Sequence, residues 1–292
     1  MRPTRLFTAL AFLIPFSGAL WAATPEDSQS PGLCANARFS KSLVLARVVL
    51  PAPPPDILHL GAALAERIAT HLRSAGDFQV RLTEPTVSTH LEPAVDAFAR
   101  WGIPYFVRLS GKDFGVSGQT SVFSMIGPSI NPRGGTLHLV VSAGMTAEPV
   151  LNTTLHANPV AGALFNPPID ALGTGFWQTP YGQSLDALSQ QAASAIADQL
   201  RCTPLIGTVL AVDGSTVTIN RGSADGLRFS DAAMILARSD PLNGLGQPIL
   251  PERFTFHRSA EARIRQLDPH TAKVQIQGDG TVQVGDIVWV GQ

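Results

Sequence analysis

The character of the sequence changes at Cys202-Thr203-Pro204, and this change constrains the fold more than any other feature. Before it, segments with the periodicity of helices and of strands alternate. After it, residues 204–292 contain only short segments of alternating polarity, separated by turn sequences such as Asp213-Gly214. Six short strands without a helix predict a small β-barrel. The strands are expected at residues 207–212, 216–220, 232–238, 260–267, 272–276 and 287–290.

Residues 36–203 predict a mixed α/β domain in which helices cover a sheet. The order of elements over residues 41–109 is strand, helix, strand, helix, strand. Two further strands are expected at residues 136–143 and 150–155, followed by a long helix at residues 181–200.

The first of these helices has clear boundaries. Asp56 precedes it and is expected to cap its first turn, and Gly76 follows its last turn, where a left-handed residue is favourable. Its buried face is expected to consist of four residues that recur every fourth position: Leu60, Leu64, Ile68 and Leu72.

The beginning of the chain has the pattern of a secretion signal. In residues 1–22, Arg2 and Arg5 precede an apolar run that ends in small residues. The alternative is a membrane anchor, but a membrane-spanning helix needs about 20 apolar residues, more than this run provides. We therefore expect cleavage, export to the periplasm, a flexible leader over residues 23–35, and no transmembrane segment in the mature chain.

Charge argues against one class of partner. Removing two of the 21 basic residues with the signal leaves 19 against 22 acidic residues, a net charge of −3. A nucleic-acid-binding protein would show a basic surplus, so no nucleic-acid partner is expected. Charged residues make up only 15% of the chain, which suits a subunit of an assembly.

Cys34 and Cys202 are the only cysteines. In an oxidising compartment two cysteines most often pair, which predicts a Cys34–Cys202 disulfide. The alternative is two separate buried thiols. No CxxC sequence is present, so thiol redox catalysis is not expected.

No constellation of catalytic or metal-binding residues emerges from the sequence. No histidine pair has the spacing of a zinc-binding helix, and no serine lies in a nucleophile elbow. His59 and His71 are expected at the surface, whereas His138 and His156 fall on neighbouring strands and could meet. The sequence thus predicts a binding or structural protein with no catalytic residue, cofactor or metal; a hydrolase would require a nucleophile or acid–base cluster in a cleft.

Large aromatic residues mark the candidate interaction surface. Residues 157–180 are rich in Pro and Gly but contain Phe165, Phe176 and Trp177, and aromatic side chains need a surface to pack on. We expect these three residues, and secondarily the proline-rich loop 51–55, to contact a partner. The alternative is that both segments pack on their own domain.

Three groups of residues resemble the bacterial flagellar assembly protein T family. The strand 43–48, with its helix and Gly76-Asp77-Phe78, resembles the family's middle domain, which is similar to the N-terminal domain of TolB. The segment 176–182, leading to the helix that ends at Cys202-Thr203-Pro204, resembles the last helix of that domain. The C-terminal SH3-like barrel of the family is matched by Gly207-Thr208-Val209, Val217 to Gly222, Asp225-Gly226-Leu227 and Val284-Gly285-Asp286.

The resemblance implies a TolB N-terminal-like mixed α/β domain over residues 36–203, followed by an SH3-like barrel over residues 204–292. It implies a periplasmic structural protein that helps to assemble the outer ring, or H ring, of the flagellar basal body. Its partners would be ring proteins and possibly further copies of itself. The family's separate N-terminal domain is expected to be missing, because only a short leader separates the signal from Cys34. The alternative is a TolB- or CsgG-like envelope adaptor that binds lipoproteins or peptidoglycan and has no flagellar role.

Overall fold

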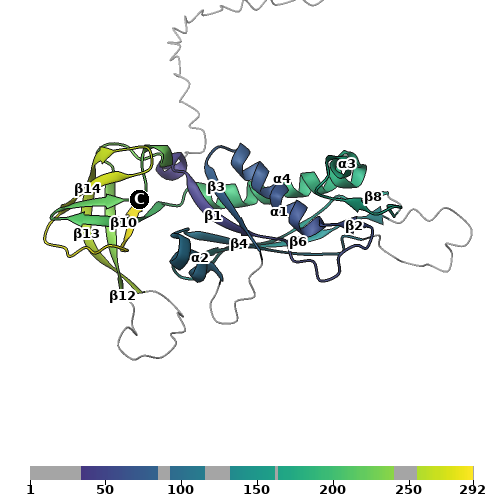
Figure 1. The fold of residues 1–292 in the computed structure, drawn as a ribbon, viewed down its shortest axis with the longest axis horizontal. Coiled ribbons are helices and arrows are strands. Elements are labelled where there is room, and N and C mark those ends of the chain that lie inside the picture. Colours follow the sequence, from purple (N-terminus) through teal and green to yellow (C-terminus); the bar gives the residue numbers. More distant parts are fainter. Residues whose placement is uncertain (1–33, 85–92, 116–131, 162–163, 240–254, 292) are drawn as a thin grey trace, which may run out of the picture. The chain divides into compact units, whose positions relative to one another are not determined.

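The computed structural model describes residues 34–84, 93–115, 132–161, 164–239 and 255–291 (Figure 1). The described residues from Cys34 onward form one compact unit. The expected signal peptide and almost all of the expected leader lie outside the described residues. Among the described residues, none of the helices combines the length and the apolar character needed to cross a membrane.

A mixed five-stranded sheet forms the centre of the α/β part. Strand β1 is parallel to both β3 and β4, and the β4–β6–β7 meander is antiparallel. The order across the sheet is β3-β1-β4-β6-β7. The strands are β1 (Lys41–Ala46), β3 (Phe78–Thr83), β4 (Tyr105–Lys112), β6 (Thr136–Ala143) and β7 (Pro149–His156).

Helices cover the sheet on both faces. Figure 1 shows α1 (Leu60–Ser74) and α4 (Pro180–Arg201) side by side, and they pack on the face that carries Leu43 and Val107. Helix α2 (Pro93–Trp101) packs on the opposite face, against Phe106. The strand–helix–strand–helix–strand order expected for residues 41–109 is therefore confirmed.

Helix α1 confirms the predicted periodicity but not the predicted cap. Its four apolar positions are buried to 2% exposure or less, and Gly76 is left-handed with φ of 86°. However, the N-cap position belongs to His59, not Asp56. The expectation for Asp56 was wrong because its carboxylate lies inside the protein, where it pairs with the buried Arg133.

Short elements order the segment that the sequence predicted as an aromatic loop. Strand β2 (Ile57–Leu58) pairs with β9 (Ile169–Asp170), and β5 (Pro132–Arg133) pairs with β8 (Val160–Ala161). The one-turn helix α3 (Thr174–Gln178) then leads into α4.

Six strands close into a barrel after Pro204, as predicted. Their order is β10-β11-β14-β13-β12-β15, which closes the sheet on itself and leaves no free edge. Val217, Ile235 and Val274 are among the residues that fill its interior. The strands are β10 (Leu205–Asp213), β11 (Thr216–Ile219), β12 (Ala232–Ser239), β13 (Thr255–Leu267), β14 (Ala272–Gln277) and β15 (Ile287–Val290).

A short segment before β1 connects the barrel to the sheet. It begins with the predicted Cys34–Cys202 disulfide, across which the Cα atoms are 5.5 Å apart. It continues through the 3₁₀ turn η1 (Ala35–Arg38) to Phe39, which is 1% exposed and packs in the core of the barrel. Arg38 donates a hydrogen bond to the carbonyl oxygen of Gly226, at 2.8 Å. Residues that the sequence assigned to the α/β part thus complete the barrel.

Lys41, the first residue of β1, is buried beside the disulfide. Its ammonium group donates hydrogen bonds to the carbonyl oxygens of Asn36 and Thr203. Burial lowers the pKa of Lys41 to about 8, although the negative charge of Asp77 acts in the opposite direction.

This burial predicts a pH dependence of stability. Between pH 8 and about 10.5 the unfolded chain holds a proton on Lys41 that the folded protein has released, so the free energy of unfolding rises with pH in this window. Below pH 8 both states hold the proton and the contribution is constant. In Lys41→Met this rise, of up to about 3 kcal/mol, should be missing.

Urea unfolding of both proteins at pH 7 to 10.5 measures the difference, because all other titrating groups are shared. Parallel pH profiles for the wild type and Lys41→Met would contradict the burial of this charge.

Candidate interaction surface

The described residues contain no group of three or more histidine, cysteine or acidic side chains that could hold a metal ion. His59 lies 3.2 Å from a carboxylate oxygen of Asp170. His138 and His156 do not bond to each other but to polar side chains on the opposite strand of the β6–β7 hairpin. The partner of His138 is Asn152, at 2.8 Å, and that of His156 is Thr136, at 3.3 Å.

The three predicted interaction residues form one aromatic cluster, and most of it is internal. Phe176 is fully buried and belongs to the core beneath α1 and α4, so its ring is not available to a partner. Phe165 and Trp177 are half-buried and meet Phe176 edge to face, with ring centroids 6.3 Å and 5.1 Å away. The cluster therefore anchors residues 164–178 to the α/β part.

A buried ion pair holds this cluster in place. Arg133 is fully buried, and its guanidinium lies 2.8 Å from the carboxylate of Asp56 and within 5 Å of the ring centroids of Phe165 and Tyr181. Asp56 also accepts the backbone N–H of Phe165, at 2.8 Å. Burial alone would raise the pKa of Asp56, but the hydrogen bonds from Arg133 and Phe165 outweigh it and lower the pKa below its ordinary value.

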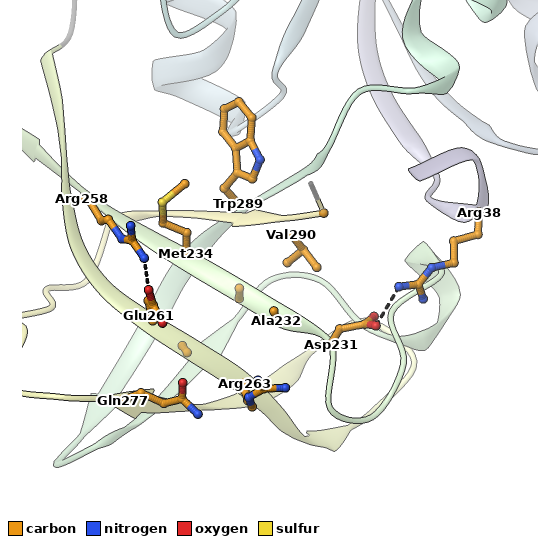
Figure 2. Close-up of a pocket in the computed structure, with 13 residues that line it drawn as sticks. Arg38, Asp231, Ala232, Met234, Arg258, Glu261, Arg263, Gln277, Trp289 and Val290 are labelled. Atoms are coloured by element: carbon orange, nitrogen blue, oxygen red, sulfur yellow. Dashed lines mark hydrogen bonds and ion pairs between the residues drawn. The ribbon is translucent and has the colours of Figure 1, made fainter. Parts of the chain in front are cut away.

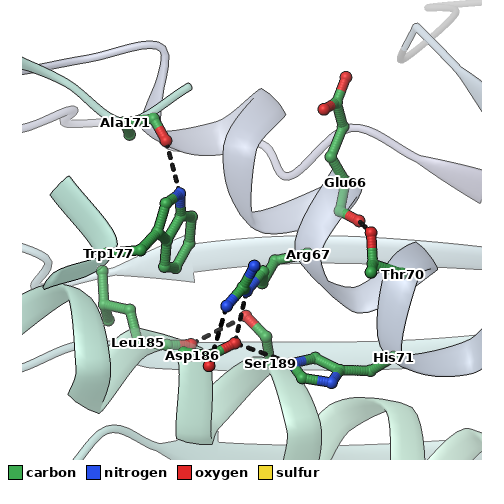
Figure 3. A network of polar contacts seen from close by, with 9 residues as sticks. All are labelled: Glu66, Arg67, Thr70, His71, Ala171, Trp177, Leu185, Asp186 and Ser189. Atoms are coloured by element: carbon green, nitrogen blue, oxygen red, sulfur yellow. Dashed lines mark hydrogen bonds and ion pairs between the residues drawn. The ribbon is translucent and has the colours of Figure 1, made fainter. Parts of the chain in front are cut away.

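A second polar network ties the two long helices together (Figure 3). Arg67 of α1 donates two hydrogen bonds to Asp186 of α4, at 2.6 and 3.1 Å, and His71 lies 2.7 Å from the same carboxylate. The hydrogen bonds from Arg67 hold the pKa of Asp186 below its ordinary value. The guanidinium also stacks on Trp177, 5.1 Å from the ring centroid, and the indole N–H donates to Ala171. The network joins α1 to α4 and, through Trp177, to the segment that precedes α4.

The barrel carries a groove of about 430 Å³ on its outer surface (Figure 2). The strand register places Trp289, Met234, Glu261 and Gln277 in one row across four neighbouring strands. Trp289 and Met234 are half-buried, so the row offers apolar surface at one end and polar groups at the other.

Charge is unevenly distributed around this groove. Arg38 pairs with Asp231 at 2.7 Å, and Arg258 pairs with Glu261. The remaining lining cation is Arg263, which is exposed and forms no ion pair with any other described residue. The groove therefore has a net positive charge in a chain whose net charge is −1. Neither Trp289 nor Arg263 was singled out in the sequence, because only the barrel register places them on one face.

Comparison with known proteins identifies no family. No protein-family model matches the chain, and neither does any curated protein. Among solved structures, a PelC dodecamer from Paraburkholderia phytofirmans is 10% identical, with a TM-score of 0.37 over 55% of this chain and 88% of that chain. Lipoprotein GNA1162 from Neisseria meningitidis is 8% identical, with a TM-score of 0.32 over 53% and 99%. TolB from Acinetobacter baumannii is 14% identical, with a TM-score of 0.30 over 84% and 62%.

The buried ion pair gives a direct test of what holds residues 164–178. Asp56→Asn leaves the charge of Arg133 buried without its counter-ion, and we expect it to lower the free energy of unfolding by roughly 3 kcal/mol. The matched control is Asp170→Asn, because Asp170 lies close in sequence to the same cluster but is half-exposed. Urea unfolding at pH 7 should show a much smaller change for the control; equal losses would contradict the role assigned to the buried pair.

Proposed function

We propose that this chain is an exported binding protein of the bacterial cell envelope, which holds partner proteins in place and carries out no reaction. The observation that carries this proposal is the Cys34–Cys202 disulfide, which lies where the sheet and the barrel both begin. Disulfides persist in oxidising compartments and are rare in the cytosol. The signal-like residues 1–22 supply the means of export.

The groove on the barrel is the proposed binding site. Trp289 and Met234 provide the apolar, partly desolvated surface that protein interfaces favour at their centre. Arg263 provides a cation that is free to pair with a carboxylate of the partner. The chemistry of the groove suits a protein segment in which an acidic residue lies beside an apolar one.

Two versions of this function are considered, and they differ in the partner proteins that the chain would hold in place. The first is an envelope adaptor that binds lipoproteins or other envelope proteins without a flagellar role, and the groove and the disulfide support it directly. The second is an assembly factor for the outer ring of the flagellar basal body. Its support is the motif resemblance alone, which includes Asp225-Gly226-Leu227 in the barrel.

Complementation of a gene deletion separates the two versions. An envelope adaptor predicts detergent sensitivity with normal flagella, whereas a ring assembly factor predicts loss of the outer ring in images of basal bodies and loss of motility. In either case the wild type should restore the phenotype and Arg263→Glu should not, because the reversed charge repels an acidic partner.

Arg265→Glu is the matched control, since Arg265 is exposed on the same strand and does not line the groove. A deletion with neither phenotype would contradict the proposed function. Full restoration by Arg263→Glu would show that the groove is not the binding site for the partner.

A further inference from the structure

One edge of the five-stranded sheet is open. Strand β7 is the last strand in the order and is paired with β6 alone, and no other described strand lies against its outer side. The barrel has no comparable edge because it is closed. An open edge presents backbone N–H and C=O groups that can pair with another strand.

The hydrogen-bond pattern shows which residues direct these groups outward. The N–H of Ala157 donates to the carbonyl oxygen of Gly135, at 2.8 Å, which marks a hydrogen-bonded pair at the end of the β6–β7 ladder. Since such pairs alternate along antiparallel strands, the odd-numbered residues of β7 bond to β6. Asn152, Thr154 and His156 therefore present their backbone groups to the open edge, and all three are exposed.

This edge also lacks the features that keep natural edges apart. Residues 150–156 contain no proline, glycine, lysine, arginine or acidic residue, and the register shift in this ladder lies at its far end, beside Pro149. The opposite edge, β3, is different: it carries Arg81, whose guanidinium lies 4.2 Å from the ring centroid of Trp101. Glu84, which follows β3, pairs with Arg47.

We propose that the open edge of β7 pairs antiparallel with the same edge of a second copy of this chain, on a twofold axis at Thr153. This register places Leu151 opposite Leu155 of the second copy, on the face covered by α4, where both leucines are half-buried and packed against the core. On the other face it places Asn152 opposite Thr154. Apolar residues thus meet apolar ones and polar residues meet polar ones, with no like charges opposed.

The backbone permits this register. Asn152 and Thr154, which present outward groups, form hydrogen-bonded pairs across the axis, and Thr153 faces its own counterpart in a non-hydrogen-bonded pair. A single pair of strands buries far less than the roughly 1,200 Å² of a stable interface. The dimer is therefore weak in solution and forms where the local concentration is high.

Cross-linking at the axis tests the register. In Thr153→Cys the two Cβ atoms lie about 4.5–5.5 Å apart, close enough for a disulfide after a small adjustment. The native cysteines are already paired, so the introduced thiol is the only free one. Mild oxidation should give mostly disulfide-linked dimer for Thr153→Cys and at least about fivefold less for Asn152→Cys, which is displaced by about two residues from its counterpart. Equal yields, or a higher yield for Asn152→Cys, would overturn this pairing.

A second variant tests the backbone pairing itself. Thr154→Pro removes an outward N–H that β6 does not use, so it should preserve the monomer and abolish the dimer, whereas Thr154→Ala should preserve both. Sedimentation at about 5 to 500 μM should show a concentration-dependent rise in mass for the wild type and Thr154→Ala only. A wild type that stays monomeric throughout would overturn the proposal, as would dimerisation that Thr154→Pro leaves unchanged. If Thr154→Pro fails to fold, the cross-linking comparison decides.

Discussion

The Cys34–Cys202 disulfide is the constraint on which the rest of the structure depends. It joins the segment before β1 to the end of α4, so that the whole α/β part lies within a loop of 168 residues. The sheet begins at Lys41 and the barrel begins at Leu205, each a few residues from one of the two cysteines. A single covalent bond therefore fixes the common origin of both parts, and Phe39 extends this link into the core of the barrel.

The free energy by which this disulfide stabilises the fold is large compared with the net stability of a protein domain. Closing a loop of this length removes conformational entropy from the unfolded chain worth about 5 kcal/mol. The net stability of a folded domain is only about 5–15 kcal/mol. The buried charge of Lys41 and the ion pair between Asp56 and Arg133 are costly to desolvate, so the cross-link offsets part of what they cost. A reducing compartment would remove this stabilisation. The fold therefore depends on export to an oxidising compartment, which the signal-like residues 1–22 would provide.

The sequence was sufficient where neighbouring residues determine the structure. The four-residue spacing of α1 and the alternating strands after Pro204 correspond to the structure, because periodicity and turns are local signals. The Cys34–Cys202 pair spans 168 residues and was predicted for another reason, because the chain has only these two cysteines. Contacts between distant residues could not be predicted in this way. Asp56 is of a residue type that favours helix N-caps, and nothing near it in the sequence indicates that it pairs with Arg133. For Phe176 the sequence left two alternatives open, contact with a partner and packing on its own domain, and the two short β-ladders and the ion pair hold its ring in the core.

The proposed binding surfaces depend on register in the same way. Trp289 and Arg263 lie on different strands and share the groove only because the barrel closes with one particular stagger. The open edge of β7 follows from the order of the five strands. The lack of charged side chains on β7 matters for pairing only because β7 is the last strand in this order. The two surfaces differ in charge: residues 150–156 of the β7 edge carry no acidic residue, lysine or arginine, whereas the groove carries Arg38, Arg258 and Arg263 against Asp231 and Glu261.

The folded protein is expected to exist with this disulfide formed, in an oxidising compartment. The most direct measurement is to quench cells with acid, alkylate the protein under denaturing conditions and determine the mass of the mature chain. Neither Cys34 nor Cys202 should be alkylated unless a reductant is added first, after which both should be. Recovery of the chain with both cysteines alkylated in the absence of reductant would contradict this expectation.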